Sequence, residues 1–435
     1  MDMAEKQKLF STTLGGVVDF QNGGAWKEDE YVVSGVPVTR VTNCQSGTVD
    51  LSGCKYLSFA SAKRYEKHQL VEGDLIVATV GSHPNQPGSV VGRTSVVPKS
   101  ASGSLLNQNA VRLRAKAGLL DQRYLTYLAS SKEFRDYIIA HARGAASQVR
   151  MSIELLKEMP LQLPPLSIQQ TVASFLDAYD KLIENNIRRI EIFEEMARRL
   201  YEEWFCELQF PGCEVAVKDW SIVPFGSVLK FNIGGGWGKD EVDNEHTHPG
   251  YVIRGTDIPS AKRLDVLRCP YRYHKSSNIR SRRLDVGDIV MEVSGGSHDQ
   301  SVGRTLYVSK ELLQVLGEDV LCASFCKRLV VDDSVVNPLF AYYHLDHAYR
   351  SGRLDQFQVQ STGIKNFQFT PFLEKHEISI PPASLQEKFG SAAAPLLALH
   401  QALSKKSVNL RAQRDLLLPK LISGEIDVSD IPMPT

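Results

Sequence analysis

Cysteine is scarce in this sequence, and long hydrophobic runs are missing. Seven cysteines occur, an odd number, and no two of them form a C-x-x-C pair. A disulfide framework and a cysteine zinc site are therefore disfavoured, and reduced thiols in a cytoplasmic protein are expected. No run of eighteen apolar residues is present, and the opening MDMAEKQK lacks the apolar centre of a signal peptide. We therefore expect neither a membrane span nor export.

Net charge is also missing, because 50 basic and 50 acidic side chains cancel. This balance excludes a protein that binds nucleic acid through overall charge alone. The charge is unevenly placed, however. Residues 161–215 carry five basic and ten acidic side chains, whereas residues 1–160 carry nineteen and fifteen. Contacts with DNA phosphates are therefore expected from the segments that flank residues 161–215.

The sequence does contain an internal repeat with a period of 211 to 217 residues. The blocks occur in the same order in both copies: 14–26 matches 225–237, 40–43 matches 254–257, 71–81 matches 285–295, 90–97 matches 301–308, and 156–170 matches 373–387. At 435 residues the chain is long enough for two or three domains. Two copies at so long a period indicate a duplicated domain rather than a solenoid.

Each copy predicts the same succession of elements. Runs of β-branched residues predict strands at 74–80, 90–97, 288–293 and 302–308, and helices are expected at 122–141 and 338–353. Paired prolines at 164–165 and 381–382 then end a short strand and precede a long helix. Each half is thus expected to be a compact α/β domain attached to one long helix.

Two heptad patterns predict that the long helices pair with each other. Between residues 168 and 205 apolar residues alternate at spacings of four and three, interrupted by Asn186, and large apolar residues recur every seven positions from Phe389 to Leu417. The alternative is two unrelated surface helices on separate domains. His400, Ser407 and Arg414 make the second pattern partly polar, so we expect that helix to contact additional neighbours.

The expected fold class is α+β, with two pseudo-repeated α/β domains joined by two long helices that form an intramolecular antiparallel coiled coil. The expected boundaries are 1–165 for the first domain, 166–210 for the central helix, 211–382 for the second domain, 383–426 for the C-terminal helix and 427–435 for a tail.

Polar and aromatic residues at related positions of the two copies are the candidates for DNA contact. Glycine-rich turns end in Trp-Lys or Trp-Gly-Lys, later loops carry amides and histidine that suit base edges, and arginines reach guanine or phosphate. A plain turn with a buried tryptophan, and solvated loop side chains, are the alternatives. The predicted DNA-binding residues are Trp26, Lys27, Arg40, Asn85, Gln86, Arg93, Gln148, Arg150, Trp237, Lys239, Arg254, His298, Gln300, Arg304 and Lys365.

Residues 262–283 add a basic segment, with eight Lys or Arg against one Asp, interleaved with Tyr271 and Tyr273. Such a composition is typical of nucleic-acid binding. A face that serves only solubility is the alternative.

No residue is a convincing catalyst or metal ligand. Asn337-Pro-Leu-Phe340 is similar to the tetrapeptide of amino-methyltransferases, but the first copy has Asp121 without a following proline. An Asx residue that caps a helix explains both positions. His246 and His248 lack further ligands at metal spacing. We therefore expect a protein that is not itself an enzyme and that needs no metal or cofactor.

Four features together carry a resemblance to a known family. They are the G-D-[LI]-[IV] blocks at 73–76 and 287–290, the P-P-x-S-x-Q-[QE] junctions, the long helices that follow them, and the closing LLLPKLISGEI at 416–426. In these features the chain resembles the specificity subunits of type I restriction–modification systems. The resemblance implies two target-recognition domains that each read half of a split target in double-stranded DNA. It also implies two methyltransferase subunits that bind the helical regions and methylate adenine N6, and two motor–nuclease subunits.

Two other classes of function stay open from the residues alone. A stand-alone DNA-binding regulator would bind DNA tightly without partners. A structural scaffold built on a coiled coil would show no salt-dependent affinity for DNA.

Overall fold

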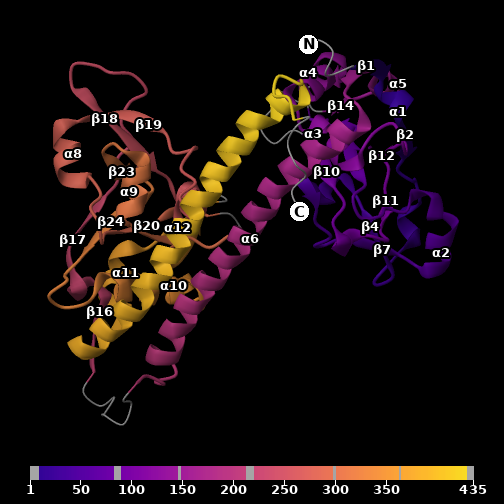
Figure 1. The fold of residues 1–435 in the computed structure, drawn as a ribbon. Coiled ribbons are helices and arrows are strands. Elements are labelled where there is room, and N and C mark those ends of the chain that lie inside the picture. Colours follow the sequence, from indigo (N-terminus) through magenta and orange to yellow (C-terminus); the bar gives the residue numbers. More distant parts are fainter. Residues whose placement is uncertain are drawn as a thin grey trace. The chain divides into compact units, whose positions relative to one another are not determined.

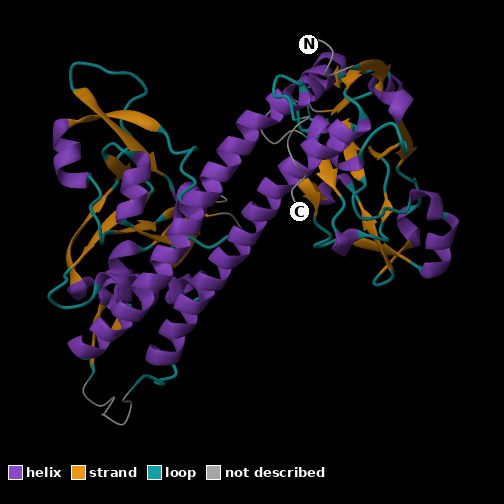
Figure 2. Cartoon of the chain, in the orientation of Figure 1, coloured by secondary structure: helices purple, strands orange, loops and turns teal. Residues whose placement is uncertain are grey.

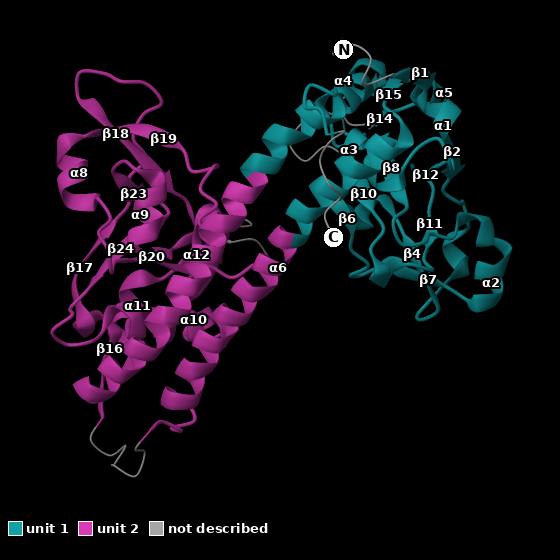
Figure 3. Cartoon of the chain, in the orientation of Figure 1, with its two compact units in different colours: residues 1–181, 412–435 teal, residues 182–411 magenta. Residues whose placement is uncertain are grey.

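The computed structural model describes residues 9–82, 90–145, 148–211, 220–296, 300–361 and 364–428. Helices and strands occur along the whole described chain (Figure 2). The chain divides into two compact units: unit 1 comprises Met1–Lys181 and Ala412–Thr435, and unit 2 comprises Leu182–Arg411 (Figure 3). The long helices α6 (Leu166–Phe205) and α12 (Ala383–Ile422) each contribute to both units (Figure 1). The predicted fold class, two α/β domains joined by two long helices, is confirmed.

Unit 1 is built on a six-stranded mixed sheet in the order β2–β12–β8–β10–β6–β5, beside a four-stranded sheet in the order β11–β4–β7–β3. Its elements before α6 are β1 (Phe10–Thr13), α1 (Leu14–Val17), β2 (Val18–Asn22), β3 (Tyr31–Val32), β4 (Val36–Thr39), β5 (Cys44–Gln45), β6 (Gly47–Val49), β7 (Lys55–Leu57), α2 (Phe59–Arg64), β8 (Leu75–Ala78), β9 (Val80–Gly81), β10 (Thr94–Val96), β11 (Leu105–Leu106), β12 (Ala110–Ala115), α3 (Gln122–Ala129), α4 (Lys132–His141), β13 (Arg143–Ala145), β14 (Gln148–Arg150), α5 (Ile153–Lys157) and β15 (Pro160–Leu163).

Unit 2 is built on a four-stranded antiparallel sheet in the order β17–β24–β20–β22, beside a three-stranded sheet in the order β19–β18–β23. Its elements between the long helices are β16 (Ser221–Pro224), β17 (Leu229–Gly234), β18 (His246–Ile253), α7 (Ile258–Lys262), β19 (Tyr271–Lys275), α8 (Ser276–Arg282), β20 (Ile289–Glu292), β21 (Ser294–Gly296), β22 (Thr305–Tyr307), α9 (Lys310–Leu316), β23 (Val320–Cys322), β24 (Cys326–Val331), α10 (Pro338–Arg350), β25 (Gln358–Ser361), β26 (Ile364–Phe367), α11 (Phe369–Lys375) and β27 (Glu377–Ile380).

The sequence repeat is also a repeat of strand pairing. The order β2–β12–β8–β10 in unit 1 corresponds to β17–β24–β20–β22 in unit 2. The strand that opens each domain pairs antiparallel with the strand that precedes the long helix, and the registers agree. Phe10 lies opposite Leu163 in unit 1, and Ser221 lies opposite Ile380 in unit 2. In both domains the first and last strands therefore lie side by side, and the last strand leads directly into a long helix.

The repeated Gly-Asp blocks form the same turn in both units. Gly73 and Gly287 adopt positive φ angles of 84° and 95°, which glycine accepts at little cost. The following Asp74 accepts a hydrogen bond from the backbone nitrogen of Val71 at 2.8 Å, and its carboxylate is held by Arg114. In unit 2, Asp288 accepts from the Asp285 nitrogen at 2.7 Å and from Arg328 Nε at 2.7 Å. The block thus closes a turn and anchors it to the neighbouring strand.

The glutamine of each P-P-x-S-x-Q junction fastens the long helix to its domain. Gln169 is fully buried, donates to the Pro164 carbonyl at 2.9 Å and accepts from the Asp121 nitrogen at 2.9 Å. Gln386 does the same, with the Pro381 carbonyl at 2.8 Å and the Asn337 nitrogen at 2.8 Å. These bonds join the first turn of α6 or α12 to the residue that caps α3 or α10.

One predicted helix is in fact two. The expectation of a single helix at 122–141 is wrong, because α3 ends at Ala129 and α4 begins at Lys132. Ser131 lies between them with extended backbone angles, and its side chain accepts from the Phe134 nitrogen. An N-cap serine starts a new helix and ends the previous one. In unit 2 the predicted helix at 338–353 is confirmed as α10, which ends at Arg350.

In each unit, α6 and α12 pack against each other in opposite directions. In unit 2, Glu194 contacts His400 at 3.4 Å, and Phe389 lies 5.1 Å from Phe205 between ring centroids. Residue numbers therefore rise along α6 as they fall along α12. In unit 1, Arg414 forms an ion pair with Asp180. Two of the polar positions predicted on the second helix, His400 and Arg414, thus contact carboxylates of the first, whereas Ser407 donates to the Leu403 carbonyl of its own helix at 2.9 Å.

Asn186 is buried in unit 2, with 4% of its surface exposed, and its side-chain nitrogen has no hydrogen-bond partner in the described part of the chain. Leaving such a group unpaired costs roughly 1–3 kcal/mol. A polar residue at a seam position can fix the register of paired helices at a cost in stability. That role for Asn186 stays a prediction.

The end of the chain closes the core of unit 1. Leu421 and Val428 are buried among residues of the first domain, with Leu417 and Ile426 packed beside them. Tyr124 Oη donates to the Ile422 carbonyl at 3.4 Å. The closing LLLPKLISGEI segment therefore completes the unit that the N-terminal domain begins.

Unit 2 buries a pair of histidines in contact. His344 Nε2 lies 2.9 Å from His376 Nε2, and Tyr201 Oη lies 3.0 Å from His344 Nδ1. Burial lowers the pKa of His376 to about 4 and holds the pKa of His344 well below its ordinary value. Both rings are neutral in the folded protein at neutral pH, so one Nε2 donates and the other accepts.

We expect unit 2 to lose stability in acid. Both folded pKa values lie below the unfolded value of about 6.5, so the contribution is complete above pH 6.5. It is lost as the pH falls from 6.5 toward 4, by on the order of 3 kcal/mol. Denaturant unfolding at several pH values should show this loss, and the double variant His344→Phe/His376→Leu should show a flatter dependence. The control His248→Gln should keep the wild-type dependence. A double variant that is as pH-sensitive as the wild type would contradict the assignment to this histidine pair.

Candidate nucleic-acid interface

In each unit a small antiparallel sheet carries predicted DNA-binding residues. The strand order is β13–β14–β9 in unit 1 and β21–β26–β25 in unit 2. Arg150 lies opposite Val80 of β9, and Lys365 lies opposite Gly296 of β21. Strands β9 and β21 lead toward the predicted base-reading loops. The backbone of Gln148 lies in β14, whereas Asn85, Gln86 and His298 lie outside the described residues.

In unit 1 this sheet places two arginines directly opposite each other. Arg143 of β13 pairs with Arg150 of β14, and both are exposed. Arg143 Nη1 donates to the Ala140 carbonyl at 2.7 Å, and Arg150 has no carboxylate within 4 Å among the residues described. Like charges directly opposite on paired strands are destabilising. A phosphate between the two guanidinium groups would remove that repulsion.

The sequence analysis missed Arg143. A signal was present, since Arg143 and Arg150 stand at the ends of a short polar segment containing Gly144. Such a segment can fold into a hairpin that brings its ends together. The position of the turn, and so the pairing, was not predicted.

The corresponding sheet of unit 2 presents amides rather than paired cations. Lys365 is half-buried and lies opposite Gln360, while the exposed Asn366 accepts a hydrogen bond from Ser294 Oγ at 2.7 Å. The exposed Gln300 follows the loop, with its amide beside the guanidinium of Arg304. Amide groups present a donor and an acceptor together, as base edges require.

The other predicted arginines already have partners inside their own unit. Arg304 forms two hydrogen bonds with the buried Glu292 at 2.8 and 2.6 Å, which raise the pKa of Arg304. Arg254 binds both carboxylate oxygens of Asp257 at 2.8 Å. Arg93 Nη1 donates to a backbone carbonyl at 3.1 Å, and Arg40 Nη2 does so at 3.5 Å. The repeated motifs that contain them therefore have a structural role, and their contact with DNA stays a prediction.

The two predicted tryptophans have different surroundings. Trp26 is half-buried, packs against Tyr65 at 5.2 Å and adjoins a small core. Trp237 is 40% exposed, with the guanidinium of Arg272 over its ring at 4.5 Å. Lys27 is exposed, and Lys239 forms an ion pair with Asp243 at 2.6 Å.

The glycines before these tryptophans let the chain approach its own backbone. A Cβ atom on Gly23 would lie 1.9 Å from the Asn107 carbonyl oxygen, and one on Gly235 would lie 2.2 Å from the Ala323 carbonyl oxygen. Any side chain at either place would overlap the backbone. The glycine-rich turns are thus explained by packing within each domain.

Much of the charge in residues 262–283 is neutralised. Five of the cations contact carboxylates of unit 2, namely Lys262 with Asp346, Arg263 with Glu191, Arg272 with Asp240, Lys275 with Glu245, and Arg283 with Asp285. Arg282 Nε donates to the Gly234 carbonyl at 2.9 Å. The surface charge of this segment is therefore smaller than its composition predicts.

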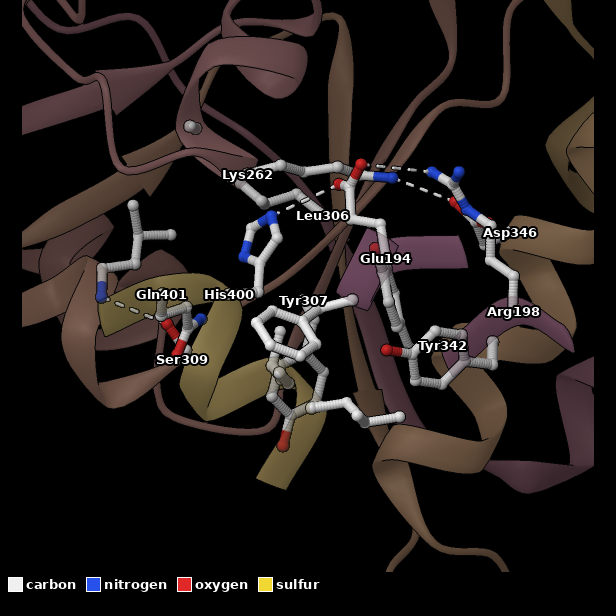
Figure 4. Close-up of a pocket in the computed structure, with 16 residues that line it drawn as sticks. Glu194, Arg198, Lys262, Leu306, Tyr307, Ser309, Tyr342, Asp346, His400 and Gln401 are labelled. Atoms are coloured by element: carbon white, nitrogen blue, oxygen red, sulfur yellow. Dashed lines mark hydrogen bonds and ion pairs between the residues drawn. The ribbon is translucent and has the colours of Figure 1, made fainter. Parts of the chain in front are cut away.

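The buried part of this segment holds the second domain on the long helices. Figure 4 shows Lys262 and Arg198 converging on Asp346 and Glu194 beside His400. Lys262 Nζ lies 2.9 Å from Asp346 Oδ1, and Arg198 Nε lies 3.4 Å from Asp346 Oδ2. Burial alone would raise the pKa of Asp346, but the surrounding cations lower it. These contacts link α7 and α10 to α6.

The helix-capping interpretation of Asn337 and Asp121 is confirmed. Asn337 Oδ1 accepts from the Leu339 nitrogen at 2.9 Å, and Asp121 Oδ1 accepts from the Arg123 nitrogen at 2.9 Å. Within the described ranges, no three His, Cys, Asp or Glu side chains are placed to hold a metal ion. No helix in those ranges has the length and apolar character needed to cross a membrane.

Comparison with known proteins finds sequences and a structure similar to this chain. Residues 10–192 match the sequence family described as type I restriction modification DNA specificity domain. The type I restriction enzyme MjaIX specificity subunit of Methanocaldococcus jannaschii is 24% identical over 340 residues, which are 75% of this chain and 73% of that protein. The putative MjaX specificity subunit of the same organism is 22% identical over 220 residues, 49% of this chain and 50% of its own length.

The fold is similar to a solved specificity subunit over almost its whole length. The crystal structure of the S subunit of a type I restriction-modification system from M. genitalium covers 97% of this chain and 98% of its own, with a TM-score of 0.57 at 15% identity.

We expect Arg150→Glu to weaken DNA binding while stabilising unit 1. The new carboxylate would lie opposite Arg143 and form a cross-strand pair that contributes roughly 0.2–1 kcal/mol. The same change would repel phosphate, so the dependence of DNA affinity on salt should become less steep by at least about one unit. Denaturant unfolding and DNA titrations at several salt concentrations measure the two effects.

Arg135→Glu is the matched control, because Arg135 is exposed on the neighbouring helix α4 and the charge change is identical. It should leave DNA affinity close to wild type. Equal weakening by both variants would argue against a local role for the paired arginines.

Proposed function

We propose that the chain is a specificity subunit of a type I restriction–modification system and reads a split DNA target, one half with each unit. The observation that supports this is the structural duplication. Both units repeat the strand order, the Asp–Arg pair behind the Gly-Asp turn and the glutamine junction. One scaffold used twice, with different surface residues, suits two different half-sites.

We place the two readers at residues 1–165 and 211–382, with helices at 166–210 and 383–426 and a tail at 427–435. The small sheets of the two units differ in the groups they expose. Unit 1 presents Arg143 and Arg150, and unit 2 presents Asn366 and Gln300. A reader that relies on guanidinium groups and one that relies on amides would contact different bases and phosphates.

The helix pair is proposed to keep the two half-sites at a fixed spacing. In unit 1 the Asp180–Arg414 ion pair, and in unit 2 the Glu194–His400 contact, each join α6 to α12. Sliding one helix by a turn would break both contacts inside a partly buried seam. A split target read with a constant gap needs such a fixed register.

The methyl transfer is proposed to belong to partner subunits. Two adenine methyltransferase subunits would bind the helical regions, where Ile192 and Met196 of α6 are 55% and 47% exposed and Leu416 of α12 is 65% exposed. Motor–nuclease subunits would complete a restriction complex. In this proposal the chain selects the sequence and performs no chemical step of its own.

The proposal is tested by exchanging one reader. Residues 1–165 would be replaced by the equivalent domain of another specificity subunit, and the hybrid would be co-expressed with the methyltransferase of this system. Mapping of methylated adenines should show that one half of the motif changes while the other half and the gap are kept. Replacement of residues 211–382 should change the complementary half.

A change in both halves, or in neither, would refute the division of labour. Methylation by the purified chain alone would contradict the non-catalytic role. Tight, sequence-specific binding by the chain without any partner would favour a stand-alone regulator.

A further inference from the structure

A cleft of about 590 Å³ lies in unit 2 where the second domain meets the two long helices. Cations dominate its lining. They are Arg198, Lys262, Arg263, Arg304, Arg350 and Arg411, against the carboxylates Glu194, Asp265 and Asp346.

The cations at the floor of the cleft are already paired. Asp346 is held by Lys262 at 2.9 Å and by Arg350 at 3.1 Å, and Arg304 is held by the buried Glu292. These contacts fix the shape of the cleft. They leave little charge at its floor for a ligand.

The two remaining arginines are more available. Arg411 of α12 has no carboxylate within 4 Å among the described residues, and Arg263 has only the exposed Glu191 at 3.5 Å. An exposed ion pair of this kind is worth at most about 1 kcal/mol. Thr305 also lines the cleft, is 2% exposed, and has a hydroxyl without a hydrogen-bond partner in the described part of the chain.

Unit 1 has a cleft of its own, of about 820 Å³, whose lining has a different charge. Its lining contains the cations Arg123, Lys132 and Arg414 and the carboxylates Asp177, Asp180 and Asp415. The charges of the lining in unit 1 therefore balance. The lining of unit 2 has three more cations than carboxylates, although Arg304, Arg263 and Arg350 also contact Glu292, Glu191 and Glu202, which lie outside the lining.

We propose that the cleft of unit 2 binds the phosphodiester backbone of the DNA between the two half-sites, through Arg263 and Arg411. This proposal rests on the proposed function. Arginine suits the site because its planar guanidinium can donate two hydrogen bonds to one phosphate. Part of the lining comes from α6 and α12 rather than from the small sheet of the reader, so we assign the bound phosphate to the spacer rather than to the half-site. Asp265 on the lining repels phosphate and sets where the backbone can lie.

Contacts to backbone phosphates add affinity without reading sequence. The unit 2 reader has a balanced overall charge, with twenty basic and twenty acidic residues in 216–383. A local pair of arginines beside the helices would supply the electrostatic affinity that the domain as a whole lacks.

The test uses the complex of the full chain with its methyltransferase subunits, and DNA affinity measured at several salt concentrations. The double variant Arg263→Ala/Arg411→Ala should make the plot of log affinity against log salt less steep by about two units, one for each phosphate contact. Affinity should fall by the same factor for target and non-target duplexes. Arg263→Lys/Arg411→Lys should retain most of the slope, because the charge is kept.

The matched control is Lys132→Ala/Arg135→Ala in unit 1, which removes two exposed cations of α4, one of which, Lys132, lines the balanced cleft. It should leave the slope close to wild type. An unchanged slope in the arginine variant, or an equal effect of the control, would overturn the proposal.

Modified DNA locates the contact. Neutral methylphosphonate linkages placed only in the spacer should weaken binding of the wild type and have little effect on the arginine variant. Neutral linkages in the half-sites should weaken both proteins. If spacer linkages weaken both equally, the arginines do not contact the spacer. Inorganic phosphate is also tested as a competitor of DNA at constant ionic strength. If the arginine variant differs from the wild type only in being insensitive to this competitor, the cleft is a site for free phosphate and the proposal fails.

The methylation map keeps the two proposals separate. A wild-type complex that does not methylate a split target would refute the proposed function. A split target that is methylated normally, with an unchanged salt slope in the arginine variant, would refute only the assignment of this cleft.

Discussion

Leu176 of α6 and Leu421 of α12 are buried in the same core as the first domain, and Trp204 of α6 and Phe389 of α12 are buried in the core of unit 2. Each domain therefore buries apolar surface on a helix pair rather than on its own elements alone. This shared packing is the constraint on which the molecule depends. A domain that lost contact with the helices would expose a large apolar face, so folding of each unit and pairing of the helices are coupled.

The duplication shows which interactions belong to the scaffold and which are free to vary. Asp74 and Asp288 close the same turn, and Gln169 and Gln386 make the same pair of bonds. All four are buried and bond to backbone groups, which cannot be satisfied by another side chain without rearrangement. Exposed positions such as Arg150 and its structural counterpart Asn366 differ instead. A change at these exposed positions leaves no buried group unpaired.

The sequence predicted the long helices and the repeat because both are periodic and local. It also predicted that Asp121 and Asn337 cap helices. It did not predict that Arg304 is held by Glu292, or that Arg143 lies opposite Arg150, since these contacts depend on strand register rather than on spacing along the chain. The break at Ser131 was missed for a related reason. A capping serine inside an apolar pattern resembles any other polar residue of an amphipathic helix.

The net charge of a segment is also a poor guide to what a ligand meets at its surface. Residues 161–215, which contain α6, are acidic as a whole, and on that ground this helix was expected to avoid phosphate. The structure resolves this average into pairs. On α6, Arg198 contacts Asp346 while Glu194 contacts His400 of α12, so much of the acidity is internal. A ligand meets the charges that internal contacts leave unpaired, and near Arg411 the unpaired charge is positive. Because electrostatic attraction is screened within about 10 Å at 0.1 M ionic strength, such a local excess decides binding more than the sum over the helix.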